Sequence, residues 1–172
     1  MRIFQGTPKL VGIEPGSDSV TKVIPLPGTV ALQSTHLDDI RFSPDGRTGY
    51  VTGGGTRGAI IVIDLEAGEG VRALDGHPST QGRQVRHRLG RRPTVAPDGI
   101  SIPNDGSTLC WQALTGRTLY AIDTTPPRPQ VAEAGRASAV QTDATTHVAD
   151  GLWMSGAGTL HLTSSTGDSI KR

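Results

Sequence analysis

The sequence lacks the features that mark several common protein classes. It has one cysteine, Cys110, so no disulfide can form within the chain, and the apolar stretch around it predicts a buried thiol. No run approaches the roughly 18–20 apolar residues of a transmembrane helix. The first residues, from Met1 to Lys9, contain no apolar stretch of the signal-peptide kind. The formal net charge of +1 gives no reason to expect a nucleic acid or a membrane as partner.

Long helices and familiar catalytic motifs are also missing. No window sustains a 3.6-residue apolar period, because Gly or Pro interrupts every candidate. The histidines lack the spacing of a zinc protease, and no Gly-x-Ser-x-Gly motif is present. The Gly53–Gly55 run follows an expected strand but opens no helix, which argues against a phosphate-binding loop.

A repeated pattern takes the place of these features. The chain has 23 Gly and 12 Pro residues, and turn residues separate many short apolar runs. Asp39, Asp98 and Asp150 lie at the same place in three successive units, 59 and then 52 residues apart. After each Asp come a short strand, a tight turn and a second strand, and Asp-Gly between apolar runs is a strong hairpin signal.

Units of this length with four antiparallel strands predict the blades of a β-propeller. We expect an all-β, partial six-bladed propeller with two whole blades flanked by partial ones. A β-sandwich built from similar hairpins is the alternative, and the constant phase of the Asp-Gly turns argues against it. The predicted ranges within the single 1–172 domain are outer strands of one blade (8–30), a blade (37–75), a basic inter-blade loop (76–95), a second blade (96–133) and a partial blade (148–172).

The incomplete blades at both ends predict exposed strand edges. Such edges favour pairing with another chain or aggregation. We therefore interpret the sequence as a fragment of a longer protein or a truncated gene product. Missing N-terminal blades or a second chain would then be needed to cover the open edges.

Several segments resemble the major royal jelly protein/yellow family and its bacterial relatives. They include Leu37-Asp-Asp-Ile-Arg-Phe, Leu74-Asp-Gly-His-Pro-Ser-Thr, Leu114-Thr-Gly-Arg-Thr-Leu-Tyr and Ala149-Asp-Gly-Leu-Trp. The resemblance runs from about Pro8 to Arg172 and covers the family's C-terminal half. It implies a six-bladed propeller related to the senescence-marker/gluconolactonase group, and an extracellular or periplasmic location.

The repeat also predicts where chemistry would lie. Propeller blades place equivalent residues of their innermost strands around a central channel, so the three repeat aspartates should converge there. Carboxylates that share one axis repel each other unless protons or a cation intervene, and Ca²⁺ or Mg²⁺ prefers oxygen ligands. The alternative is that each Asp only caps a local turn. For Asp45 and Asp105 we expect this turn role.

By resemblance, Asp98 and Asp150 match metal-binding positions, with Ca²⁺ the expected cofactor, and Asp38 and Asp39 match a pair near a small organic ligand. In relatives a Glu from a blade outside this chain completes the metal site. At the position of Asp38 the family usually has Asn, and where this chain reads Thr52-Gly-Gly-Gly55 it has an acidic turn.

Histidines near the channel are the candidate general bases. His36 and His147 lie two or three residues before a repeat Asp. His77 is expected to bond locally, and the arginines between Gln81 and Arg92 are expected to form a solvated loop. Two functions stay open: a metal- and ligand-binding propeller with lactonase-like hydrolase or isomerase activity, and a non-catalytic secreted binding or structural propeller.

Overall fold

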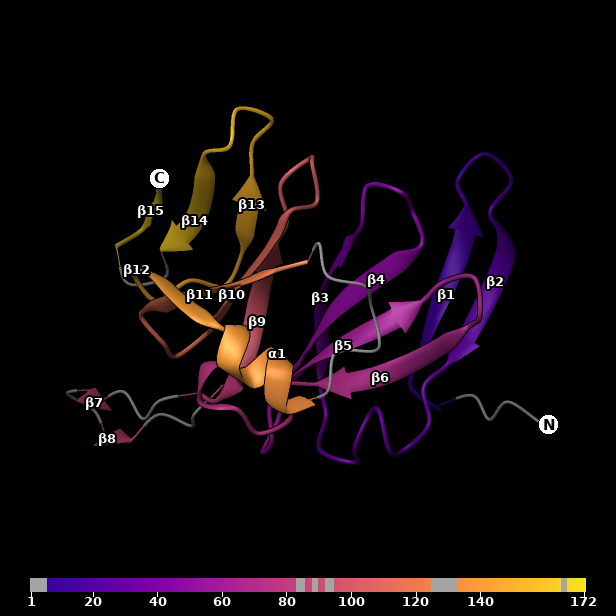
Figure 1. The fold of residues 1–172 in the computed structure, drawn as a ribbon, viewed down its shortest axis with the longest axis horizontal. Helices are drawn as coiled ribbons and strands as arrows, with labels where there is room; N and C mark the ends of the chain where they lie inside the picture. The colour runs from indigo at the N-terminus through magenta and orange to yellow at the C-terminus, as the bar shows by residue number, and fades with distance from the viewer. Residues whose placement is uncertain (1–5, 83–85, 88–89, 92–94, 125–132, 165–166) are drawn as a thin grey trace.

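The computed structural model describes residues 6–82, 86–87, 90–91, 95–124, 133–164 and 167–172. Over these residues the chain forms successive antiparallel sheets and one short helix (Figure 1). The sheets follow one another from the N-terminal hairpin at one end to the C-terminal strands at the other. None of the helices formed by these residues is long and apolar enough to cross a membrane.

Two four-stranded meanders form the middle of the molecule. The first contains β3 (Leu37–Phe42), β4 (Thr48–Gly53), β5 (Ala59–Asp64) and β6 (Glu69–Ala73), in that spatial order. The second contains β9 (Pro97–Ser101), β10 (Thr108–Ala113), β11 (Thr118–Asp123) and β12 (Gln141–Thr145). Two partial sheets flank them: β1 (Lys9–Glu14) with β2 (Ser19–Pro25), and β13 (Leu152–Met154), β14 (Leu160–Ser164) and β15 (Ser169–Lys171).

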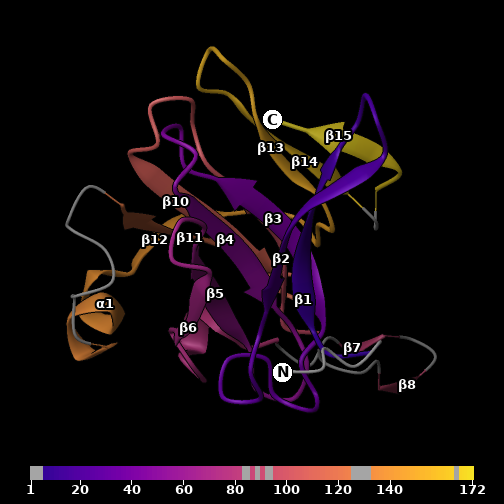
Figure 2. The same ribbon diagram turned by 90° about the vertical axis from the view of Figure 1, so that its right-hand side faces the viewer.

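This arrangement confirms the predicted partial propeller with two whole blades between partial ones. The second blade extends past the predicted range of 96–133, because its outermost strand is β12. The helix α1 (Glu133–Ala139) precedes this strand and lies at the outer side of the sheet (Figure 2). The predicted inter-blade loop contains a short 3₁₀ turn, η1 (Pro78–Thr80), and the small hairpin of β7 (Arg86–His87) with β8 (Gly90–Arg91). The remaining arginines of that loop lie outside the described residues.

The turns between the inner strands form as the sequence predicts. Gly46, Gly106 and Gly158 all have φ near +70°, which an L side chain would adopt only with strain. Asp105 accepts hydrogen bonds from the Ser107 amide and hydroxyl, and these bonds lower the pKa of its carboxyl. Asp45 accepts equivalent bonds from the amide of Arg47 and the hydroxyl of Ser43. The turn role expected for these two aspartates is therefore confirmed.

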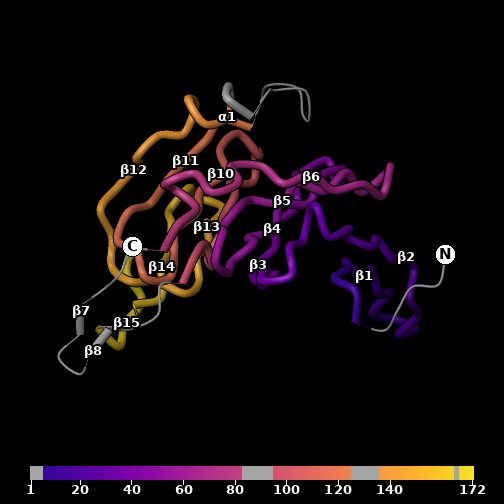
Figure 3. The backbone as a smooth tube through the Cα atoms, turned by 90° about the horizontal axis from the view of Figure 1, so that it is seen from below, coloured from indigo at the N-terminus to yellow at the C-terminus, as the bar shows by residue number. Residues whose placement is uncertain are grey.

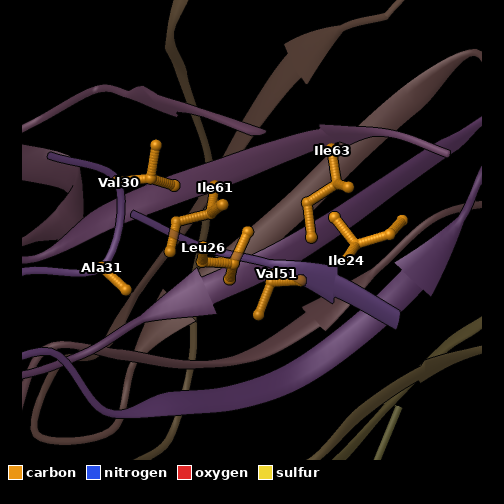
Figure 4. Packing of buried hydrophobic residues seen from close by; sticks show 7 residues of the cluster. All are labelled: Ile24, Leu26, Val30, Ala31, Val51, Ile61 and Ile63. Carbon is orange, nitrogen blue, oxygen red and sulfur yellow. The ribbon is translucent and has the colours of Figure 1, made fainter. Parts of the chain in front are cut away.

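Apolar faces join each sheet to the next. Between the N-terminal hairpin and the first blade lies a buried aliphatic cluster (Figure 4), made of Ile24, Leu26, Val30, Ala31, Val51, Ile61 and Ile63. Between the first and second blades lie Tyr50, Ile60, Ile100 and Trp111 among others. Burying each such large side chain contributes roughly 1.5–3 kcal/mol, so these clusters fix the arc of sheets.

Candidate functional site

The innermost strands of three sheets meet at one side of the arc. β3, β9 and β13 are each the first edge of their sheet, and β9 packs beside both β3 and β13. This is the arrangement that lines the channel of a propeller. The repeat aspartates lie on these strands or just before them: Asp39 on β3, next to Asp38, Asp98 on β9, and Asp150 two residues before β13.

A glycine permits the close approach of β9 to β13. A Cβ atom built on Gly99 would lie 2.0 Å from Leu152 Cδ1 and 2.5 Å from the Asp150 carbonyl oxygen. Real Cβ atoms never come so close, so only glycine lets the two backbones pack at this distance. Gly99 of the Asp98-Gly99 pair therefore allows Asp98 to lie close to Asp150.

The carboxyl groups of Asp98 and Asp150 are hydrogen-bonded to each other. Burial raises the pKa of Asp98 to about 7, and the Asp150 carboxylate adds to the shift by accepting this bond and by its charge. The charges of Asp38 and Asp39 raise it further. A pKa of about 7 leaves the Asp98 carboxyl partly protonated at neutral pH.

Asp38 belongs to the same cluster. Burial raises the pKa of its carboxyl, the nearby His36 opposes the shift, and Asp150 and Asp39 reinforce it. Its Oδ2 lies against Gly54, where a Cβ atom would come within 2.8 Å. The glycine run after β4 thus makes room for this carboxylate.

Asp39 has a cationic partner that the sequence analysis missed. Arg41 Nη1 lies 2.6 Å from Asp39 Oδ1, and the Arg41 Nη2 donates to the Leu152 carbonyl at 2.8 Å. The two residues are two apart on one strand, so they share a face, and this spacing is a signal that was available in the sequence. The arginine neutralises Asp39 and links β3 to β13.

Two threonines fix the backbone around the aspartates in matching ways. The Asp39 amide donates to Thr52 Oγ1 at 3.0 Å, and the Asp150 amide donates to Thr163 Oγ1 at 3.3 Å. Thr52 Oγ1 also donates to the Asp98 carbonyl at 2.7 Å, which ties the first blade to the second. The shared pattern supports the structural equivalence of Asp39 and Asp150 that the repeat predicts.

The two candidate histidines differ in position. His36 lies near enough to Asp38 to influence its ionisation. His147 is exposed, and its contact with the second blade is made by its carbonyl oxygen, which accepts from Gln112 Nε2 at 2.6 Å. His77 bonds locally, since its Nδ1 accepts from the Ser79 amide at the start of η1. Cys110 is buried, and burial raises its pKa to about 11, which makes it a poor nucleophile.

The aspartate cluster is not a complete metal site by itself. Among the described residues, no three His, Cys, Asp or Glu side chains are arranged to hold a metal ion. Two hydrogen-bonded carboxylates with two more nearby are hard oxygen donors, and they fit part of the shell of Ca²⁺, which takes six to eight oxygens. Water and ligands from elsewhere would have to supply the rest.

Comparison with solved structures agrees with the fold. Hydrazine synthase from Kuenenia stuttgartiensis is similar over 95% of this chain and 50% of its own, with a TM-score of 0.64 and 12% identity. A chain of the nidogen/laminin complex is similar over 96% and 52%, with a TM-score of 0.57 and 16% identity. The dihydro-heme d1 dehydrogenase NirN is similar over 92% and 28%, with a TM-score of 0.51 and 14% identity.

These likenesses show a β-propeller fold, and hydrazine synthase and NirN are propeller proteins. The chain spans about half the length of the first two structures. No protein-family model matches the chain. No curated protein matches it either. The comparisons therefore support the fold and do not extend to the royal-jelly/yellow resemblance.

The raised pKa of Asp98 predicts a pH-dependent stability. The pKa of Asp98 in the folded protein, about 7, lies above the ordinary 3.8 of an Asp carboxyl, so the wild type loses stability as pH rises from about 4 through 7. The Asp98→Asn variant should escape this loss. At about pH 8 its gain should be on the order of 1 kcal/mol, a figure reduced for the partial exposure of the pair, and at about pH 4 the gain should vanish.

Urea denaturation at several pH values measures this difference. Asp105→Asn is the matched control, because the pKa of Asp105 is lowered and its carboxyl is ionised in both states above about pH 5. Its effect should not change between about pH 5 and 8. An Asp98→Asn effect that is equally constant over that range would contradict the raised pKa of Asp98.

Proposed function

We propose that this partial propeller binds a divalent cation, Ca²⁺ in preference to Mg²⁺, and through it a small organic ligand. The observation that carries the proposal is the hydrogen-bonded Asp98–Asp150 pair, with Asp38 close by, at the meeting of three inner strands. A cation would replace the proton on Asp98 and relieve the repulsion between the carboxylates. Asp98 and Asp150 are the proposed cation ligands, and Asp38 and Asp39 the proposed contacts of the organic ligand.

The charges around the cluster support separate roles for these residues. Asp39 is held by Arg41, so a polar ligand can meet both a carboxylate and a guanidinium there. Asp38 lies near His36. In this proposal His36 accepts a proton from water or from a hydroxyl group of the ligand. A bound cation would supply polarisation of a carbonyl group, the chemistry that a lactonase-like hydrolase or an isomerase needs.

The royal-jelly/yellow resemblance favours an extracellular or periplasmic place of action. Calcium sites of extracellular proteins have Kd values of about 10⁻⁴ to 10⁻³ M, which suits a shell with few protein carboxylates. We therefore expect weak binding, in the range of calcium levels outside the cell.

One observation favours the second candidate, a non-catalytic binding or structural propeller. Asp39 is already neutralised by Arg41, which bridges β3 and β13, so part of the cluster serves the packing of the inner strands. In that case a cation would leave the stability unchanged. The same experiment separates the two functions.

Thermal unfolding of the whole chain with and without about 10 mM CaCl₂ is the test. With a Kd of about 10⁻⁴ to 10⁻³ M, binding of Ca²⁺ to the folded state should raise Tm by roughly 3–10 °C. The Asp98→Asn plus Asp150→Asn double variant should lose this increase. NaCl of equal ionic strength should not reproduce it.

The matched control removes two carboxylates elsewhere. Asp18→Asn plus Asp143→Asn changes the exposed turn after β1 and the outer strand β12, and it should keep the full calcium response. If calcium has no effect on the wild type, or shifts the Asp98/Asp150 variant equally, the cation-binding proposal fails and the structural role stands.

A further inference from the structure

Thr52 lies fully buried on β4, and its hydroxyl contacts both the first blade and the second. The Asp39 amide donates to its Oγ1 at 3.0 Å, and the same Oγ1 donates to the Asp98 carbonyl at 2.7 Å. Its contact with the Asp39 carbonyl is longer, at 3.3 Å, and a hydroxyl has one proton to donate, so the bond to Asp98 is the preferred one. Thr52 therefore joins the backbone of β3 to the backbone of β9.

The peptide that follows Asp98 is also held by the third sheet. Beside Gly99 lie Leu152 Cδ1 and the Asp150 carbonyl oxygen, at 2.0 and 2.5 Å from the place that a Cβ atom would take. This peptide is thus bonded to Thr52 at its oxygen and packed against the third sheet at Gly99. Because both of its ends are fixed, the direction in which the Asp98 carboxyl leaves β9 is fixed as well.

A second link from the first blade reaches the third sheet. Arg41 Nη2 donates to the Leu152 carbonyl at 2.8 Å, and Arg41 Nη1 is paired with Asp39 Oδ1 at 2.6 Å. β3 and β13 therefore come close together near the middle of the molecule (Figure 3). Asp39 is common to both links, since its amide bonds to Thr52 and its carboxylate to Arg41. The first blade thus holds backbone atoms close to both carboxyls of the pair.

The corresponding threonine of the third sheet bonds differently. Thr163 Oγ1 accepts from the amides of Asp150 and Gly151, at 3.3 and 2.9 Å. Both amides belong to the segment that leads into β13, which pairs with β14, the strand on which Thr163 lies. Support of the aspartate backbone within one sheet is therefore the role that the two threonines share. The bond from Thr52 to the second blade is an addition to it.

We propose that Thr52 is a positioning residue of the cation site, acting through the Asp98 carbonyl to hold the Asp98 carboxyl beside that of Asp150. This inference rests on the proposed cation binding, because it assigns Thr52 a part in the same site. Oxygens of both carboxyls must lie within about 2.3–2.6 Å of one Ca²⁺ ion, so a small shift of β9 separates them from a common ion. Ligands that are already in place bind more tightly than ligands that must be ordered on binding.

Titration of the whole chain with Tb³⁺, followed by its luminescence, tests this role. Thr52→Val keeps the shape of the side chain and removes the hydroxyl, so the Kd should rise roughly three- to tenfold. Thr52→Ser restores the hydroxyl and should return the Kd to within about twofold of the wild type. Thr52→Cys, whose thiol is a weak donor, should lie between them, and it serves as the second variant if valine prevents folding. Circular dichroism checks that each variant is folded.

Thr124→Val is the matched control. Thr124 is also buried, and its hydroxyl donates to the Gly106 carbonyl at the turn after β9, at the opposite end of that strand from Asp98. Removing this hydroxyl should lower the stability of the fold and leave the Kd for Tb³⁺ unchanged. A general loss of stability is thereby separated from an effect on the site.

Crystal structures of the metal-free wild type and of Thr52→Val separate this role from cation binding itself. The hydrogen bond between Asp98 and Asp150 should be present in the wild type and absent from the variant. A wild type that binds no Tb³⁺ would contradict the proposed function, and the two structures would still decide the role of Thr52. A Thr52→Val variant with the wild-type Kd and an intact carboxyl pair would overturn the proposal, because Thr52 would then only stabilise the fold.

Discussion

Gly99→Ala should lower the free energy of unfolding by about 1–3 kcal/mol, and Gly99→Val by more. The added Cβ atom would overlap Leu152 Cδ1 and the Asp150 carbonyl oxygen, at 2.0 and 2.5 Å. β9 and β13 must then move apart, and the Asp98–Asp150 hydrogen bond is lost with them. The variant should therefore also lose the decrease in stability with rising pH that the raised pKa of Asp98 causes. Urea denaturation at about pH 5 and 8 measures both effects.

Gly151→Ala is the matched control for this substitution. It lies directly after Asp150, and its added Cβ would meet Thr163 atoms at ordinary distances of 3.6 and 3.7 Å. Its effect should stay within about 0.5 kcal/mol. If Gly99→Ala were as stable as the wild type and kept its pH dependence, the close approach of the two strands would not be the cause of the carboxyl pair.

Trp111→Ala should cost about 3–5 kcal/mol of stability. The indole is fully buried, stacks on Tyr120 with ring centroids 6.2 Å apart, and donates from Nε1 to the Ser79 carbonyl at 3.1 Å. The side chain thus fills the space between the two whole blades and anchors the η1 turn. Unfolding followed by circular dichroism measures the loss.

Trp111→Phe separates packing from the hydrogen bond. It keeps much of the apolar volume and leaves the buried Ser79 carbonyl without this donor, so a smaller cost of about 1–3 kcal/mol is expected. Equal losses for Phe and Ala would show that the hydrogen bond dominates and would contradict the packing role assigned to the ring.

The repeat made most of the fold predictable from the sequence. Tight turns depend on local backbone conformation, so Gly46, Gly106 and Gly158 marked the hairpins correctly. The outermost strand β12 was not predicted. It is short and mostly exposed, and its residues Gln141–Thr145 carry no apolar alternation, so only its pairing with β11 makes it a strand.

The candidate site was predictable only in outline. The same place of Asp39, Asp98 and Asp150 in the three repeat units indicated that they lie at the starts of equivalent strands. Their individual partners depend on contacts between sheets, which a single sequence does not specify. Thr52 reaches the Asp98 carbonyl across 46 positions of the chain, and Arg41 reaches Leu152 across 111. These long-range contacts surround an Asp39 that is paired with Arg41 and an Asp98 whose carboxyl has a raised pKa.

Anomalous diffraction from crystals of the chain soaked with Tb³⁺, a hard ion that accepts the same oxygen ligands as Ca²⁺, shows whether Asp98 and Asp150 bind a cation. We expect a dominant peak within about 2.3–2.6 Å of oxygen atoms of both Asp98 and Asp150. That peak should be absent from crystals of the Asp98→Asn plus Asp150→Asn variant. A dominant peak elsewhere on the chain, or none at the aspartate pair, would contradict a cation site at the meeting of the inner strands.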